Sequence, residues 1–599
     1  MTESKRGDFF LSALVDFPDD VLARDYTHEK IGQMMTALAA LGIRRVFWMY
    51  YGSKNDGLLY DEKRLFWNPE GRRRVKQCFE TVDRPLEVAV PAAKENGMEI
   101  YAVIKPYETG LSFTVPEGSP EAGLFPQVER IGGYVPVVYN FTARHPDMRI
   151  ERRMDNIPAN IDSIPIQTVV LMKNDEHPTR IKKENIEIWT SPNNYKYTRK
   201  RVDFSFREAV VDNPEEIRDH QGNVIVKAQQ AVRTITLSGL ALTDRFILIT
   251  TNLKGPGDFR NIPVRLMKAY GPDNQNVPIV VATSRCLWTS SRNFKDYGLD
   301  FDTGFADGFN GCDLCLDEDS SGGEAGFIAF ARGVNRYLPG ALCEAYPEVR
   351  EYFKNQVREV LAMGVDGVDI RISAHSCHTD DDPCAYGFNK PIMDAYKKQY
   401  GVEATGKDLD LKKLADIRSA IFSDFMRDLS FMVRQDKKKF GFSINQEFMR
   451  DTPAALEPPD CALKAVFPYY QRIQRPWNID FNWKDWIKNG LLDFVCLRNH
   501  VTSPDFHLND DFTHSVLKEA KQRGLETIYV RYVCHAGYKD KSSANSLQNL
   551  MREMDLIYSD KRINSLQLYE VCDFTELDEK GRVRCYAPFA ETIKNWRKP

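Results

Sequence analysis

The segment that most constrains the fold is an apolar stretch at residues 365–372, which directly follows an amphipathic helical pattern at residues 346–361. Side chains of a strand alternate between two faces, so Asp369 and Arg371 should point to one face and Val368 to the other. A buried parallel strand is normally apolar on both faces. Asp369 and Arg371, which alternate with apolar residues toward the C-terminal end, therefore predict that this end opens on a polar site, as in a closed barrel of alternating strands and helices.

The same alternation of strand and helix recurs through most of the chain. Seven further barrel strands are predicted at residues 9–17, 43–51, 98–108, 439–447, 492–500, 527–533 and 563–570. Helical patterns lie at residues 26–41, 86–96, 390–400, 414–434, 483–489, 511–523 and 543–558. Eight strands with a helix before each next strand are the count of a (β/α)8 TIM barrel, so the predicted fold class is α/β.

The rhythm of strand and helix is interrupted between residues 111 and 310, where helical periodicity is largely absent. Short β-like runs separated by turn residues predict an antiparallel β-sandwich inserted between the third and fourth barrel strands. Its flanks, 111–163 and 283–325, are loop-like and are expected over the barrel mouth. The predicted domains are residues 1–115 and 326–599 for the barrel and 116–325 for the insert. The β-like runs lie at residues 166–172, 186–190, 231–237, 246–251 and 277–281.

Composition excludes several classes of partner. The formal net charge of the 599 residues is -4, so no basic field indicates nucleic acid or an anionic membrane surface. No apolar run reaches the roughly 18 residues of a membrane span, and the N-terminal apolar run is too short for a signal peptide. A cytoplasmic location is therefore expected, or a periplasmic or secreted one if a leader has been removed. The 12 scattered cysteines are expected to be mainly buried thiols.

Polar residues end every predicted barrel strand from the second onward, and in a barrel these ends meet at one mouth. Helix capping and solvated turns are the alternative explanation for any single one of them. The candidate catalytic residues are the three carboxylates Asp369, Glu447 and Glu570, and the candidate substrate-binding residues are Tyr50, Lys105, Glu108, Arg371, His375, Arg498, His500 and Arg531.

The three carboxylates point to cleavage of a glycosidic bond, which commonly uses one carboxyl group as acid and a second as nucleophile or base. Arg371 is expected to keep Asp369 ionised, while a partly apolar strand end is expected to raise the pKa of Glu447 toward that of an acid. The non-catalytic alternatives are a structural salt bridge between Asp369 and Arg371, and a role as helix cap or surface charge for Glu447 and for Glu570.

Three arginines at strand ends, Arg371, Arg498 and Arg531, indicate an anionic sugar, because a guanidinium binds a carboxylate through two parallel hydrogen bonds. Neutralisation of the three catalytic candidates explains the same arginines equally well. His375 and His500 suit proton transfer or contact with a sugar hydroxyl, although hydrogen-bonded scaffolding is the more common role of such histidines.

No cofactor and no metal ion is predicted. The loop at residues 375–384 is rich in metal-ligand types but lacks a recognised ligand spacing, and Cys312 and Cys315 form a lone pair without a second pair. The chain also lacks a phosphate-binding loop of the Gly-Lys-Ser/Thr kind and a Gly-x-Ser-x-Gly motif.

Three segments carry a resemblance to a known group of proteins: Tyr-Pro-Glu-Val-Arg at 346–350, Gly-Val-Asp-Gly-Val-Asp at 364–369, and the Trp-rich stretch at 483–493. They resemble the glycoside hydrolase-like TIM-barrel proteins often labelled "family 10 glycosylhydrolase". The resemblance covers the barrel, implies a glycosidase, and carries over to one site residue, Asp369. Those proteins often have a second aspartate where this chain has Arg371, so their catalytic pairing does not carry over to this chain.

Two weaker likenesses accompany this one. A carboxylate on the fourth strand and another on the fifth resemble the α-amylase superfamily, whose arginine precedes the aspartate instead of following it. Residues 178–194 of the insert are similar to discoidin-type carbohydrate-binding sandwiches.

The sequence thus favours a glycoside hydrolase acting on an oligosaccharide or glycoside, with the arginines indicating an anionic one. A lyase or isomerase acting on an acidic sugar, and a non-catalytic carbohydrate-binding protein, are the alternatives. The sugar, the linkage and the stereochemical outcome are not fixed by the sequence, which is also compatible with a homo-oligomer.

Overall fold

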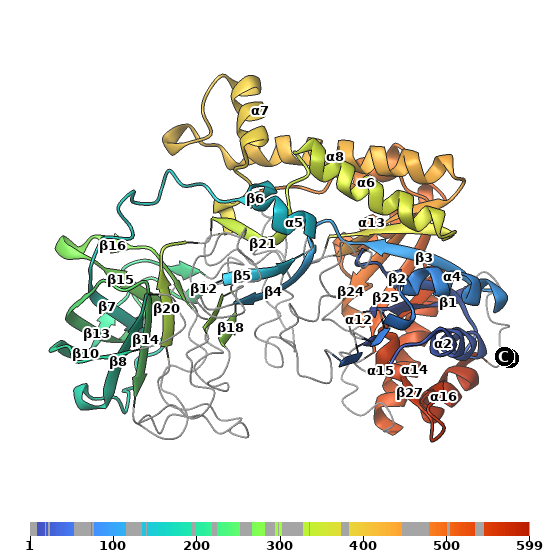
Figure 1. The fold of residues 1–599 in the computed structure, drawn as a ribbon, viewed down its shortest axis with the longest axis horizontal. Helices are drawn as coiled ribbons and strands as arrows, with labels where there is room; N and C mark the ends of the chain where they lie inside the picture. Colours follow the sequence, from blue (N-terminus) through green and yellow to red (C-terminus); the bar gives the residue numbers. More distant parts are fainter. Residues whose placement is uncertain are drawn as a thin grey trace.

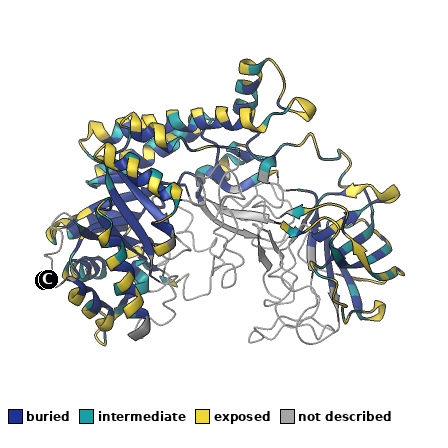
Figure 2. Cartoon of the chain, turned by 180° about the vertical axis from the view of Figure 1, so that it is seen from behind, coloured by how far each residue is buried: buried dark blue, intermediate teal, exposed yellow. Residues whose placement is uncertain are grey.

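The chain folds into a barrel and a β-sandwich that lie at opposite ends of the molecule, as Figures 1 and 2 show from two sides. The structure is a computed structural model. It describes residues 9–17, 20–21, 24–52, 73–74, 77–78, 80–114, 134–138, 140–192, 198–218, 224–251, 266–281, 294–296, 299–301, 328–334, 336–372, 383–445, 478–499, 504–533 and 544–597.

Eight parallel strands close into a barrel in the order β1-β2-β3-β22-β23-β24-β25-β26. The predicted (β/α)8 TIM barrel is therefore confirmed, with each strand inside or within one residue of its predicted range. The strands are β1 Phe10–Val15, β2 Ile43–Met49, β3 Glu99–Ile104, β22 Gly367–Arg371, β23 Lys439–Asn445, β24 Phe494–Asn499, β25 Glu526–Tyr532 and β26 Ser565–Tyr569.

Amphipathic helices surround these strands. Alternate strand residues such as Val46, Ile100 and Val368 face outward and share one buried core with the apolar sides of the helices. Figure 2 shows the result, with buried strands inside and the exposed residues on the outer sides of the helices. The main helices are α2 His28–Ala40, α4 Pro85–Glu95, α6 Pro347–Ala362, α7 Lys390–Tyr400, α8 Leu411–Gln435, α11 Trp483–Lys488, α13 Asp511–Gln522, α14 Ala544–Ser559 and α16 Ala587–Arg597.

Side chains of the other strand face fill the barrel in layers. Phe47, Tyr101 and Phe494 meet across the interior, with ring centroids 5.3 Å apart for Phe47–Tyr101 and also for Tyr101–Phe494. Glycine makes room for them: a Cβ at Gly441 would overlap the Phe494 ring, and one at Gly367 would lie 2.7 Å from Tyr101 Cε2. This aromatic layer closes the barrel below its C-terminal end.

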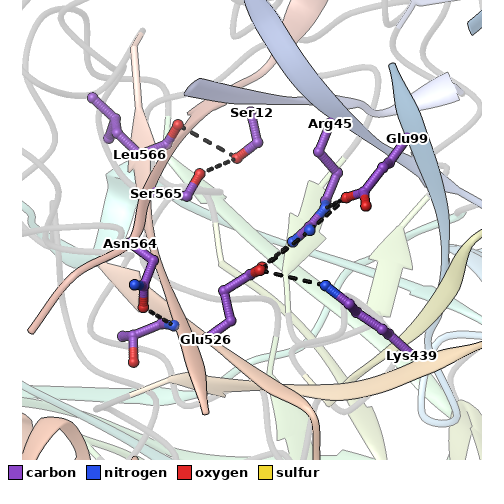
Figure 3. Close-up of polar contacts among 9 residues, drawn as sticks. Ser12, Arg45, Glu99, Lys439, Glu526, Asn564, Ser565 and Leu566 are labelled. Carbon is purple, nitrogen blue, oxygen red and sulfur yellow. Dashed lines mark hydrogen bonds and ion pairs between the residues drawn. The ribbon is translucent and has the colours of Figure 1, made fainter. Parts of the chain in front are cut away.

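Arg45 and Glu99 precede the ring-bearing Phe47 and Tyr101 by two positions, so a charged layer lies on the N-terminal side of the aromatic rings. Figure 3 shows the contacts within this charged layer. Arg45 of β2, which is buried, donates from Nε to Glu99 Oε2 at 2.7 Å and pairs through both terminal nitrogens with Glu526 of β25. Lys439 Nζ lies 3.6 Å from Glu526 Oε2. Since β2 and β25 are not neighbours in the barrel, the Arg45–Glu526 pair spans its floor.

The insert contains two five-stranded antiparallel sheets, with orders β10-β13-β7-β15-β16 and β17-β20-β14-β8-β9. Val169 and Leu237 of the first sheet and Ile247 of the second lie in one buried core, which confirms the predicted sandwich. Its strands are β7 Ile166–Met172, β8 Ile186–Ser191, β9 Thr198–Lys200, β10 Ser205–Asp212, β13 Ala231–Leu242, β14 Phe246–Thr251, β15 Met267–Tyr270, β16 Asn276–Val277, β17 Ile279–Val281 and β20 Ile328–Arg332.

The segments between barrel and sandwich contain more regular structure than the sequence suggests. In the stretch expected to be loop-like, β4 Gly110–Thr114 and β5 Tyr134–Val138 form an antiparallel pair, and α5 spans Asn140–Arg144. The strand β6, Arg149–Glu151, pairs with β21, Tyr337–Leu342, where the chain returns from the insert. At this junction Thr109 N donates to Gly340 O at 3.0 Å, so the two crossings of the chain lie together. Among the described helices, none is long and apolar enough to cross a membrane.

Candidate active site

The fourth barrel strand, β22, places Asp369 inside the barrel, above the aromatic layer. Its side chain is fully buried, and Ser443 Oγ of the neighbouring strand donates to Asp369 Oδ2 at 2.7 Å. Asp369 Oδ1 has no hydrogen-bond partner among the described residues. The period-two pattern of the sequence thus placed Asp369 and Arg371 on the same, interior face of β22.

Burial raises the pKa of Asp369 to about 6, against the opposing effects of Arg371, the Ser443 hydrogen bond and Arg498. Arg371 was expected to keep Asp369 ionised, and it does lower the pKa of this carboxyl group. Burial raises the pKa by more, because removal from water disfavours the charged carboxylate. A carboxyl group with a pKa near 6 can exchange a proton close to neutral pH.

Two arginines lie near the ring of one tyrosine at the mouth. The guanidinium carbons of Arg371 and Arg498 lie 5.8 Å and 5.5 Å from the centroid of the Tyr569 ring. Tyr569 ends β26, four strands from β22 in the closed barrel, so the Arg371 side chain extends across the mouth. The Tyr569 hydroxyl donates to Asp16 Oδ2 at 2.9 Å.

A second buried polar cluster lies at the ends of β2 and β3. Lys105 Nζ donates to Glu108 Oε1 at 2.9 Å and to the Tyr51 hydroxyl at 3.1 Å. The same hydroxyl lies 3.2 Å from Glu108 Oε1. Lys105 and Glu108, both predicted to bind substrate, therefore neutralise each other.

Of three other candidates, Arg531 and Tyr50 face away from the barrel interior that holds Asp369. Arg531 makes a two-armed ion pair with Glu553 of α14, at 2.8 Å and 3.0 Å, on the outer side of the barrel wall. Tyr50 lines a small cavity with Leu86 at the start of α4. Glu570 follows β26, is partly exposed, and accepts from Cys572 Sγ at 3.6 Å.

The remaining candidates, Glu447, His375 and His500, lie outside the described residues, as do Cys312, Cys315 and nearly all of the loop at 375–384. Within the described part of the chain, no group of three or more His, Cys, Asp or Glu side chains is arranged to hold a metal ion.

Sequence reasoning missed four residues of the mouth: Asp16, Met49, Ser443 and Tyr569. A signal existed for Asp16 and Ser443, since each continues the interior register of its strand, with Ser12 and Gly441 two or four positions earlier. Tyr569 and Met49 also continue the interior register, but an aromatic ring or a thioether at a strand end is typical of core packing, so their residue types did not indicate a site.

Comparison with known proteins gives distant structural likenesses. No family model and no curated protein matches the chain. The structure is similar to the catalytic domain of a beta-amylase from Paenibacillus polymyxa, with a TM-score of 0.38 and 7% identity over 100% of both chains. It is also similar to a GH20 exo beta-N-acetylglucosaminidase from Vibrio harveyi, with a TM-score of 0.32 and 8% identity over 99% of this chain and 57% of that chain. A chitinase from Chromobacterium violaceum gives a TM-score of 0.23 and 9% identity over 43% of this chain and 73% of that chain. At these TM-scores and identities, the likenesses assign neither a family nor an activity.

Proposed function

We propose that this protein is a glycoside hydrolase in which Asp369 transfers a proton at the mouth of the barrel. The observation that carries the proposal is the buried Asp369 carboxyl group, held by Ser443 at the C-terminal end of β22 with a pKa raised to about 6. Carboxyl groups with raised pKa values are the usual proton donors in glycosidic bond cleavage.

The second carboxylate is assigned to Glu447 or Glu570. Glu570 lies at the end of β26, next to the Tyr569 ring that faces Arg371. Glu447 follows the fifth barrel strand and is the alternative.

A lyase with a tyrosine base is less well supported. Burial and the nearby Asp16 raise the pKa of Tyr569 well above its usual value, so this phenol stays protonated at neutral pH. A histidine base would have to come from His375 or His500.

The test is hydrolysis of a glycoside library by the wild-type protein and by Asp369→Asn. We expect reducing sugar without an unsaturated product, and a loss in kcat of about a hundredfold or more in the variant, the usual contribution of acid–base catalysis. The fold of the variant is checked by circular dichroism and its melting temperature.

Ser443→Ala separates proton transfer from a positioning role of Asp369. The hydrogen bond from Ser443 lowers the pKa of Asp369, so its removal should raise that pKa. The limb of the pH–rate profile near pH 6 should therefore move to higher pH. Full activity in Asp369→Asn, an unsaturated product, or binding of glycans without turnover would each contradict the proposed reaction.

A further inference from the structure

The side chain of Arg371 has unused hydrogen-bonding capacity at the barrel mouth. It is fully buried, and its Nη1 donates to Met49 Sδ at 3.6 Å, a weak acceptor. Its Nε and Nη2 have no hydrogen-bond partner among the described residues. A buried guanidinium is normally paired or fully hydrogen-bonded, because removing it from water is otherwise unfavourable.

The two unpartnered nitrogens lie on the same edge of the guanidinium. Nε–H and one Nη2–H point in parallel, which is the arrangement that receives both oxygens of one carboxylate. Asp369 does not fill this edge: its Oδ2 lies 3.8 Å from Nη2, beyond hydrogen-bond distance, and accepts from Ser443 instead.

The Arg371 guanidinium lies at the C-terminal end of the barrel strands, near the ring of Tyr569. The guanidinium of Arg371 lies against the face of Tyr569 from the opposite wall, and Arg498 lies against the same ring. Asp16 and Glu570 lie near the same ring and offset part of this positive charge, so the preference for an anion rests first on the two parallel donors of Arg371 and is reinforced by Arg498.

We infer that Arg371 binds the carboxylate of an acidic sugar, with Arg498 adding to the positive potential and the Tyr569 ring contacting the sugar. The substrate class is thus a glycoside of a uronic acid or of another carboxylated sugar. This inference rests on the proposed function only in taking a sugar as the carrier of the carboxylate.

The experiment compares matched ligands that differ in charge. Binding of glucuronate, galacturonate and mannuronate to the protein is measured by calorimetry, beside the neutral sugars glucose, galactose and mannose. We expect at least one acidic sugar to bind about tenfold or more tighter than its neutral counterpart, the usual effect of a hydrogen-bonded charge. This preference should weaken as salt rises.

Variants assign the preference to Arg371. Arg371→Met should abolish it, and Arg371→Lys should retain only part of it, because lysine keeps the charge but loses the parallel donors. Arg434→Met is the matched control: Arg434 pairs with Asp493 at the surface, so the preference should remain.

The outcomes separate this inference from the proposed function. Tight binding of an acidic sugar without hydrolysis would overturn the glycosidase and keep the anion site. Hydrolysis of neutral glycosides with equal binding of charged and neutral sugars would overturn the anion site and keep the glycosidase. A preference that persists in Arg371→Met would also overturn the role of Arg371.

Discussion

The aromatic layer of the barrel gives a sharp prediction about Gly441. In Gly441→Ala the new Cβ would overlap the Phe494 ring, which is itself held against Tyr101 and Phe47. The ring cannot move without displacing these neighbours, so the strand or the ring must shift. Overpacking of this kind costs about 1–3 kcal/mol. We therefore expect the free energy of unfolding to fall by about 2 kcal/mol.

The measurement is urea unfolding followed by circular dichroism, with a double-mutant cycle. Phe494→Leu alone should destabilise through the lost ring contacts, whereas adding Gly441→Ala to it should cost little further, because the clashing atoms are gone. The control is Gly32→Ala in α2, where no atom lies within 4 Å of the new Cβ. This change should stabilise the protein by up to about 1 kcal/mol through helix propensity. An unaltered stability of Gly441→Ala, or strict additivity with Phe494→Leu, would refute the packing argument.

Two further predictions concern buried charges. The pKa of Asp369 is raised from 3.8 to about 6, so the folded state favours the protonated form of this carboxyl group. The shift contributes about 3 kcal/mol to the free energy of unfolding. This contribution is fully present below about pH 4 and is lost as the pH rises past about 6. The stability difference between wild type and Asp369→Asn, measured by urea unfolding at several pH values, should change by that amount, and a constant difference would contradict the raised pKa. Glu526→Gln should destabilise the barrel by about 3 kcal/mol, because it leaves the buried Arg45 with one partially exposed partner, Glu99. Lys439→Met, which removes a more exposed and more distant charge, should change the melting temperature little, and equal effects of the two variants would count against a buried pair.

The barrel was predictable because its strands and helices have different periods that are visible in the sequence. Residues 365–372 and 439–447 alternate or run apolar, and the helices between them carry apolar stripes. The order of the sandwich strands was not predictable, because β13 pairs with β7 and β10 through contacts distant in sequence. Local pattern carries no information about such pairings.

The candidate site was predictable in part. Asp369 and Arg371 alternate with the apolar residues at 368, 370 and 372, so the sequence alone predicted that both side chains point to the same face of the strand. Arg531 sits among residues that are apolar on both faces of β25, and only the closed barrel shows that it points outward to Glu553. The pKa of Asp369 depends on its burial, which sequence does not report.

The hydrogen bond between Thr109 and Gly340 has a consequence for the tolerance of the barrel to its insert. These residues are 231 positions apart, yet they are in contact, so the intervening chain leaves and returns at one point. The entropy of closing a loop grows only with the logarithm of its length, so a loop of this size costs about 3–4 kcal/mol more than a connection of about four residues. A sandwich that folds with its own core holds its two ends near each other and removes much of that difference. Adjacent strands β3 and β22 can therefore pair in parallel as in an ordinary strand–helix–strand unit, with α6 as the crossover helix and the insert as a side branch of the connection.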